Sequence, residues 1–229
     1  MSENSIPPDR RPANGRPVVA VPVEKDLATR IAEQTLAKRG EEYASEVRRL
    51  LDAALEVIRQ GGTGSRPRVA DIVAAAGLSN EAFYRHFPSK DSLVAALLED
   101  GTERLASYLS HQMSKEATPE GQIRRWVQGV LSQTRAEIAG TTLAVLWNGG
   151  SVAGGGRHNA GAPLGALLRQ PFAALGSEDP EMDASLVAHA ALGKVSDYLW
   201  SERTPSREEV EYVVAFCVGV ATRREAVRS

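Results

Sequence analysis

The chain has 229 residues, 42% of them hydrophobic and 24% charged, which is typical of a folded globular protein and excludes general disorder. Its formal net charge of −2 excludes nucleic-acid binding through a strongly basic surface, so such a role has to depend on a local arrangement of charge. The single cysteine, Cys217, excludes an internal disulfide and a cysteine-rich zinc site.

We expect a cytoplasmic protein that makes no contact with a membrane. No apolar run has the length of a membrane-spanning helix, and the polar N-terminal residues do not resemble a signal peptide. Aromatic residues amount to only 5% and alanine-rich stretches are frequent, which favours an all-α fold.

The first 40 residues predict an N-terminal extension in two parts. Five of the twelve prolines lie in residues 1–22, and proline fixes φ and removes a backbone donor, so we expect a disordered tail there. Residues 23–40 predict a short amphipathic extension helix from Glu24 to Arg39, ended by Gly40. Whether the arginines of the tail contact DNA stays open.

Residues 41–92 predict a compact unit of short helices. Apolar residues recur at helical spacing from Val47 to Ile58, and the glycines at positions 61 and 62 end this helix. Residues 69–76 predict two further turns of helix, which Gly77 interrupts. Ser79 then caps a helix over residues 80–86.

Two short helices joined by a glycine-centred turn cross steeply, as in a helix-turn-helix. Their shared core is predicted to contain Ile72, Ala76, Leu78 and Phe83. The outer face of the second helix, which enters the major groove in such motifs, then carries Asn80, Glu81, Tyr84 and Arg85.

Residues 93–229 predict a second helical domain. A helix capped by Ser89 leads into it, and further helices are expected over residues 121–139, 141–147, 163–175, 180–202 and 205–224. A glycine-rich loop over residues 148–161 lacks the strand and the Gly-Lys-Ser sequence of a phosphate-binding loop. Ser206 and Glu209 have the spacing of a capping box.

The stretch from Glu46 to Glu99 resembles the DNA-binding domain of TetR-type (tetracycline-repressor-like) transcriptional regulators. The matching segments are Leu51-Asp-Ala-Ala-Leu55, Asp71-Ile72, Ala75-Ala-Gly-Leu-Ser79, Phe83-Tyr-Arg-His-Phe87 and Ser89-Lys-Asp-Ser-Leu93. The segments have the order and spacing of the family. The sequence departs from the family pattern at Arg68, Val73 and Asn80-Glu81, which affects the expected operator sequence more than the activity.

The resemblance implies roles for residues in this segment. Tyr84 and Lys90 match positions that contact phosphate, and Arg68 and Ser79 are further candidates for backbone contacts. Asn80, Glu81 and Arg85 are candidates for reading base edges, because Asn pairs with adenine, Glu accepts from cytosine and Arg pairs with guanine. His86 is a candidate phosphate donor, and a packing or capping role is equally open.

The second domain is predicted to bind a small hydrophobic effector and to form a homodimer. Aromatic side chains with sparse polar groups suggest a pocket, although the same residues would serve as core: Trp126, Trp147, Asn148, Phe172, His189 and Tyr198. The last helix is apolar on nearly all sides, which indicates burial against a second subunit. The expected interface residues are Leu186, Ala190, Leu199, Val210, Val214, Cys217 and Val218.

The sequence therefore predicts a homodimeric, ligand-responsive regulator, in most such families a repressor, that binds a palindromic double-stranded DNA operator and needs no cofactor or metal. Its predicted fold is all-α, with an N-terminal three-helix helix-turn-helix DNA-binding domain and a helical ligand-binding and dimerisation domain. Two alternatives stay open: a DNA-binding dimer without an effector, and a small helical enzyme. The absence of a recognisable nucleophile–base pair argues against the enzyme.

Overall fold

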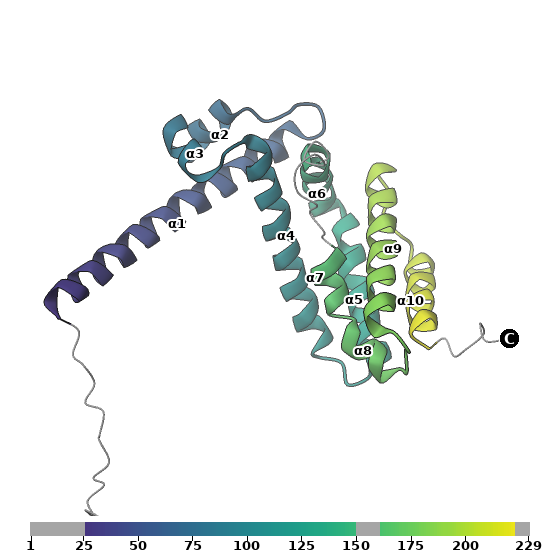
Figure 1. Cartoon of the computed structure of the whole chain (residues 1–229). Coiled ribbons are helices and arrows are strands. Elements are labelled where there is room, and N and C mark those ends of the chain that lie inside the picture. The colour runs from purple at the N-terminus through teal and green to yellow at the C-terminus, as the bar shows by residue number, and fades with distance from the viewer. Residues whose placement is uncertain (1–25, 150–160, 223–229) are drawn as a thin grey trace, which may run out of the picture. The chain divides into compact units, whose positions relative to one another are not determined.

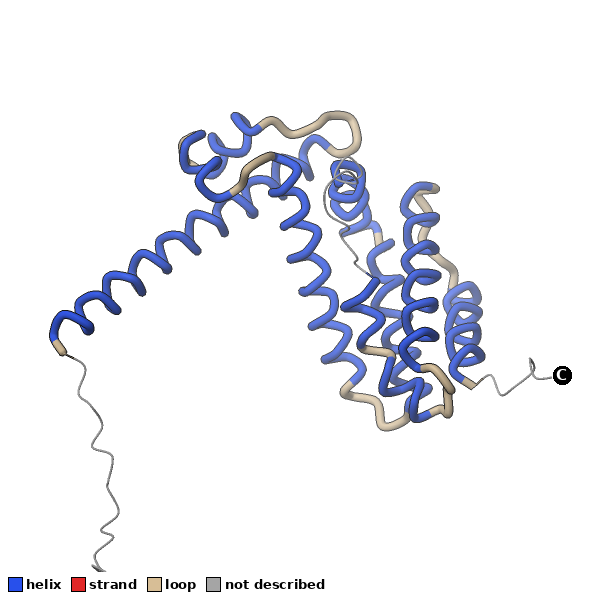
Figure 2. The backbone as a smooth tube through the Cα atoms, viewed as in Figure 1, coloured by secondary structure: helices blue, strands red, loops and turns tan. Residues whose placement is uncertain are grey.

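A computed structural model describes residues 26–149 and 161–222, and every regular element in these ranges is a helix (Figures 1 and 2). The chain divides into two compact units, residues 1–42 and 43–229. In the first unit, the described residues form the start of helix α1 (Leu27–Gly61), where the Asp26 carboxylate accepts a hydrogen bond from the Thr29 backbone N–H at 2.6 Å. The side chains of this part of α1 are exposed.

The second unit begins with the remainder of α1, which packs into a core shared with α2 (Val69–Ala76), α3 (Asn80–His86) and the start of α4 (Lys90–Met113). The central side chains Leu50, Ile72, Phe83 and Leu93 are completely buried. The all-α class and the helix-turn-helix predicted from the sequence are confirmed.

A second core lies further along α4, where this helix packs against α5 (Pro119–Leu131) and the later helices. These are α7 (Gly161–Ala166), α8 (Arg169–Ala174), α9 (Pro180–Trp200) and α10 (Arg207–Ala221). Figure 1 shows α4 extending from the α2–α3 end of this unit to the end where α8 lies, with α9 and α10 side by side. Helix α6 (Ala136–Gly149) returns to the first core, to which it contributes Ala144 and Val145.

The predicted helix end at Gly40 is wrong, because α1 continues through this residue to Gly61. A glycine inside a helix costs only about 1 kcal/mol relative to alanine. The flanking stretches are rich in alanine, leucine, glutamate and arginine, which favour helix, so this cost does not end the helix. The predicted end at Gly61 is confirmed, and Gly62 follows it with a φ of 54°.

The predicted helix over residues 121–139 is also corrected, because α5 ends at Leu131 and a 3-10 turn over Ser132–Thr134 precedes α6. The Ser132 hydroxyl donates to the Gly129 carbonyl at 2.7 Å, and the buried Thr134 hydroxyl donates to the Leu131 carbonyl at 2.7 Å. Such local side-chain hydrogen bonds compete with the helical backbone ladder, which accounts for the break.

Residues 163–175, predicted as one helix, form α7 and α8 with an interruption at Leu167–Leu168. Pro171 explains the interruption, because proline has no N–H to donate to the carbonyl four residues earlier and is tolerated only in the first turn of a helix. Most of the predicted glycine-rich loop over residues 148–161 and the predicted tail over residues 1–22 lie outside the described residues.

Candidate nucleic-acid interface

The turn between α2 and α3 is fixed by its own backbone. Gly77 has the left-handed conformation, with φ 62° and ψ 38°, and its N–H donates to the Ala74 carbonyl at 3.2 Å. The next N–H, of Leu78, donates to the Val73 carbonyl at 2.9 Å. Ser79 then caps α3 as predicted, because its hydroxyl accepts from the Ala82 N–H at 3.1 Å.

Arg49 on α1 clamps this turn from outside, a role that the sequence did not reveal. Its Nε and Nη2 donate to the Ala76 carbonyl at 3.1 and 2.5 Å, and Nη2 also donates to the Gly77 carbonyl at 3.0 Å. These carbonyls are at the C-terminal end of α2, where the helix dipole favours a cation. Arg49 therefore links the orientation of the motif to α1.

The short helix α3 has one buried face and one exposed face. Ala82 and Phe83 are buried, whereas the four predicted outer residues are exposed: Asn80, Glu81, Tyr84 and Arg85. Tyr84 exposes 58% of its surface, while its ring packs edge-on against Phe83 at 5.2 Å between centroids. The exposed face therefore carries hydrogen-bonding groups on a rigid support, as base reading requires.

One cation precedes α2 and another follows α3 in the sequence. Lys90 is half-buried in the first turn of α4, just after Ser89, whose side chain and that of Ser92 form a capping box with 3.1 Å hydrogen bonds. Lys90 forms no ion pair with any residue in the described ranges. Arg68 precedes α2, with 82% of its side chain exposed and its Nε 3.1 Å from Asp71 Oδ2. Both cations are accessible to a phosphate.

His86 lies differently from the predicted phosphate contact. Its side chain is completely buried, its Nε2 is 2.6 Å from Glu46 Oε2, and the Tyr43 ring packs edge-on against it. The hydrogen bond from His86, aided by the nearby Arg85 and Arg49 charges, lowers the pKa of the Glu46 carboxyl. We therefore remove His86 from the proposed DNA-contacting residues, because it faces α1 within the protein.

The motif over residues 50–97 matches the family model of bacterial regulatory proteins of the tetR family. These residues therefore form a DNA-binding domain of the TetR family of transcriptional regulators. TetR-family regulators of this kind are DNA-binding proteins without enzymatic activity. No curated protein sequence matches the chain.

Solved structures share the fold of this TetR-family chain over most of its length. A protein from Mesorhizobium loti MAFF303099, assigned to the TetR family, has 18% identity and a TM-score of 0.59, covering 78% of this chain and 96% of that chain. A protein from Pseudomonas aeruginosa PAO1, assigned as a transcriptional regulator, has 20% identity and a TM-score of 0.60, covering 76% and 89%. RolR, in a complex with resorcinol, has 16% identity and a TM-score of 0.57, covering 83% and 100%.

The structure does not gather the predicted effector-binding residues around one cavity. Trp126 and Phe172 are completely buried in the second core, and the Trp126 indole donates to the Leu164 carbonyl at 2.9 Å. These two residues therefore serve as core, the alternative that the sequence left open. Tyr198 also belongs to this core, but it reaches a groove as well.

The other predicted effector-binding residues lie on α6 and α9. The Asn148 amide is buried and donates to the Ala144 carbonyl at 2.9 Å. Trp147 exposes 43% of its surface and packs edge-on against Trp200, with 5.5 Å between ring centroids. His189 is exposed, and its Nδ1 lies 2.7 Å from the Ser185 carbonyl of the same helix.

A groove of about 480 Å³ lies between α9 and α10. Its lining includes Ala190, Tyr198, Tyr212, Phe216 and Cys217. Burial raises the pKa of the Cys217 thiol to about 12, so the thiol is neutral and unreactive at neutral pH.

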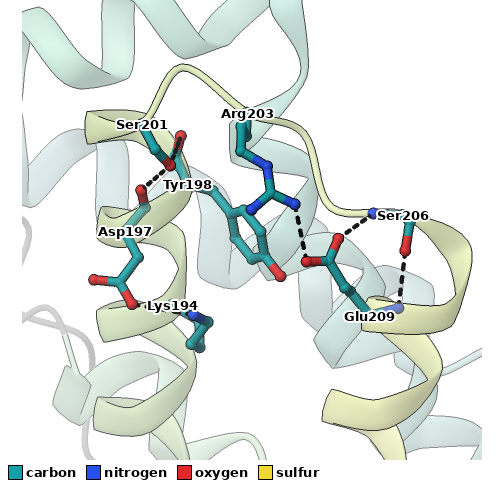
Figure 3. A network of polar contacts seen from close by, with 7 residues as sticks. All are labelled: Lys194, Asp197, Tyr198, Ser201, Arg203, Ser206 and Glu209. Carbon is teal, nitrogen blue, oxygen red and sulfur yellow. Dashed lines mark hydrogen bonds and ion pairs between the residues drawn. The ribbon is translucent and has the colours of Figure 1, made fainter.

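A polar network surrounds Tyr198 (Figure 3), and three of its members, Lys194, Tyr198 and Glu209, line the groove. Lys194 Nζ lies 5.1 Å and the Arg203 guanidinium carbon 5.8 Å from the centre of the Tyr198 ring. Arg203 donates to Glu209 at 3.1 Å, and the Ser206–Glu209 capping box predicted from the sequence is confirmed. Burial, followed by the charge of Glu209, raises the pKa of Tyr198. The network joins the end of α9 to the start of α10.

The residues predicted for the dimer interface divide into two groups. Leu199, Val214 and Cys217 are buried in the protomer's own core, so they cannot form a contact surface for a second copy. Leu186, with 59% of its surface exposed, and Ala190 face solvent on α9. Val210 and Val218 are half-buried on α10. Tyr212 and Phe216, which expose 77% and 49% of their surfaces, were not predicted.

Among the described residues, no helix is both long and apolar enough to cross a membrane. The same ranges contain no group of three or more His, Cys, Asp or Glu side chains placed to hold a metal ion.

Proposed function

We propose that this TetR-family regulator is a cytoplasmic homodimer that binds a palindromic operator and releases it when a small hydrophobic effector binds. Residues 41–92 serve as the DNA-binding domain and residues 93–229 as the ligand-binding and dimerisation domain. The observation that carries the proposal is the exposed polar face of α3, supported by the completely buried Phe83 and by the Arg49 clamp on the turn before it.

In the proposed complex, α3 lies in the major groove. Asn80, Glu81 and Arg85 face base edges, while Tyr84, Lys90, Arg68 and the exposed Ser79 contact the phosphate backbone. Only a few cations then supply the sequence-independent part of the DNA affinity, which is consistent with the net charge of −2.

An exposed apolar surface on α9 and α10 supports the homodimer. Leu186 and Ala190 on α9 and Tyr212 and Phe216 on α10 expose apolar surface beside the groove. Apolar surface of this kind on paired helices associates in water, and a symmetric dimer joins the same surface of both copies. The resulting interface is a four-helix arrangement of α9, α10 and their symmetry copies.

Helix α6 supports a coupling between effector and DNA. Its Ala144 and Val145 pack into the core of the DNA-binding helices, and a Cβ atom at Gly149 would lie 2.6 Å from Leu98 on α4. A displacement of α6 therefore has to move α4 or the DNA-binding core. An effector releases DNA only if it binds the displaced state more tightly than the DNA-bound state. The complex of the structural neighbour RolR with resorcinol illustrates small-molecule binding on this fold.

The proposal is tested by selecting binding sites from a pool of random-sequence duplex DNA. We expect enrichment of an inverted repeat whose half-sites are about one helical turn apart, or a multiple of it. Recovery of unenriched DNA would overturn the proposal. A thermal-shift screen with small aromatic and aliphatic compounds separates the effector-responsive regulator from the alternative of a DNA-binding dimer without an effector.

A further inference from the structure

One carboxylate on α1 contacts two neighbouring side chains at the C-terminal end of α3. Glu46 Oε2 lies 2.6 Å from His86 Nε2 and 3.7 Å from Arg85 Nη2. The Glu46 side chain is 29% exposed and the His86 side chain is not exposed at all, whereas Arg85 exposes 57% of its side chain. The carboxylate therefore lies between the protein interior and the exposed face of α3.

The contact with His86 is an anchor. An ionised carboxylate only accepts hydrogen bonds, so His86 Nε2 carries a proton and donates a hydrogen bond to Glu46. The other ring nitrogen, Nδ1, is buried and has no hydrogen-bond partner among the described residues. Glu46 is thus the one described polar partner of a buried imidazole. Losing a buried hydrogen bond of this kind is costly, which keeps the end of α3 against α1.

The contact with Arg85 is of another kind. At 3.7 Å it is an ion pair without a hydrogen bond, and the guanidinium remains largely in solvent. An exposed ion pair of this type changes an equilibrium constant by at most about five-fold. It is strong enough to bias where the arginine lies and weak enough for a guanine to replace it.

We propose that Glu46 is a positioning residue that sets DNA specificity, because it anchors α3 through His86 and holds Arg85 back from the phosphate backbone. The inference rests on the proposed reading of DNA by α3. On random DNA, Arg85 stays paired with Glu46 and adds little to binding. On the operator, the bidentate hydrogen bonds to guanine replace the ion pair. Glu46 therefore widens the difference between specific and non-specific affinity.

Glu46→Gln removes the charge while keeping the shape of the side chain and an oxygen that accepts from His86. We expect it to tighten binding to a random duplex about two- to five-fold and to lower the ratio of operator to random affinity by a similar factor. Asp52→Asn is the matched control, because Asp52 is exposed on the same helix and its substitution removes the same charge. The control should leave the ratio unchanged. If Glu46→Gln and Asp52→Asn show the same ratio of operator to random affinity, the role of Glu46 in specificity is overturned.

A double-mutant cycle identifies Arg85 as the group through which Glu46 acts. In an Arg85→Ala background, Glu46→Gln should no longer change the ratio of operator to random affinity. If the ratio still changes by the same factor, the action through Arg85 is excluded.

A readout without DNA tests the anchor. In the wild-type protein, the Nε2-bound proton of His86 should give a slowly exchanging downfield NMR signal, because the nitrogen is buried and bonded to a carboxylate. Glu46→Gln should shift this signal upfield, since a neutral acceptor is weaker. No such signal in the wild type, or one that Glu46→Gln leaves in place, would overturn the anchor. If the wild type selects no operator, the proposed function fails and the specificity role fails with it. The NMR signal still tests the hydrogen bond between His86 and Glu46 in that case.

Discussion

Gly77→Ala should destabilise the protein and impair DNA binding, because the turn between α2 and α3 depends on the absence of a side chain. An L-residue held at a φ of 62° costs about 1–2 kcal/mol relative to glycine. A Cβ atom at this position would also lie 3.1 Å from Arg49 Nη2, so the clamp would have to move by a few tenths of an ångström. We therefore expect a loss of about 1–3 kcal/mol in the free energy of unfolding, including a partial loss of the Arg49 hydrogen bonds.

Gly101→Ala is the matched control. Gly101 lies inside α4, and a Cβ atom there would meet no other atom within 4 Å. The same substitution should here stabilise the protein by about 0.5–1 kcal/mol, because alanine favours helix.

The midpoint of thermal unfolding, Tm, is measured for both variants and the wild type at equal protein concentration. For a chain of this size, each kcal/mol corresponds to roughly 2–4 °C in Tm, so the two variants should shift Tm in opposite directions. Operator affinity should fall for Gly77→Ala only. A Gly77→Ala protein as stable as the wild type, or a fall in Tm for both variants, would refute the reasoning about the turn.

Four further outcomes are expected. Lys90→Ala should weaken binding to all DNA sequences alike and reduce the slope of log K against log salt by about 1, whereas an unchanged slope would remove Lys90 from the phosphate contacts. Arg85→Ala should lower operator affinity by about 1–3 kcal/mol and leave random-DNA affinity nearly intact, and equal losses on both would exclude base reading. Leu186→Glu should give monomers in light scattering, whereas Ile138→Glu, at a residue 38% exposed on α6, should leave the dimer intact; a dimer in both variants would place the interface elsewhere. The Cys217 thiol, with its pKa raised to about 12, should react with a thiol reagent at pH 8 only after unfolding, and rapid reaction of the native protein would contradict its burial. The stability that depends on a neutral thiol at this position should be complete below about pH 9 and should fall as the pH rises toward 12.

The helix-turn-helix could be predicted from the sequence because short-range chemistry determines its boundaries. Gly77 adopts the left-handed conformation that ends α2. The Ser79 hydroxyl accepts a hydrogen bond from a backbone N–H in the first turn of α3, and the Ser89 hydroxyl does the same at the start of α4. Each of these signals acts within four residues. The bounds of α2 and α3 accordingly agree with the prediction.

The contacts that hold the motif in place could not be predicted, because they join residues far apart in the sequence. Arg49 reaches carbonyls 27 and 28 residues away, and Glu46 meets His86 across 40 residues. From the sequence alone, Arg49 and Glu46 are only charged residues on the solvent face of an amphipathic helix. Their roles become visible once the positions of α2 and α3 against this helix are known. For the same reason, the sequence left open whether His86 contacts phosphate or packs within the protein, and the structure shows the packing role.

For helices α5 to α10, the sequence could not separate core residues from pocket residues. Trp126 and Phe172 have the spacing and bulk of pocket residues, and these same properties suit a core, which is where both lie. For α10, the sequence indicated an excess of apolar surface but not which residues the protomer itself covers. Packing buries Val214 and leaves Phe216 49% exposed, two residues apart on one helix.

The central claim, that two copies of α3 read the two halves of an operator, is tested most directly by titrating the protein against the selected duplex and a duplex with one half-site scrambled. We expect two protomers on each intact duplex, with a loss of at least ten-fold in affinity on the half-scrambled duplex, because one reading helix then meets non-specific sequence. Equal affinity for both duplexes at the same salt concentration would contradict the account.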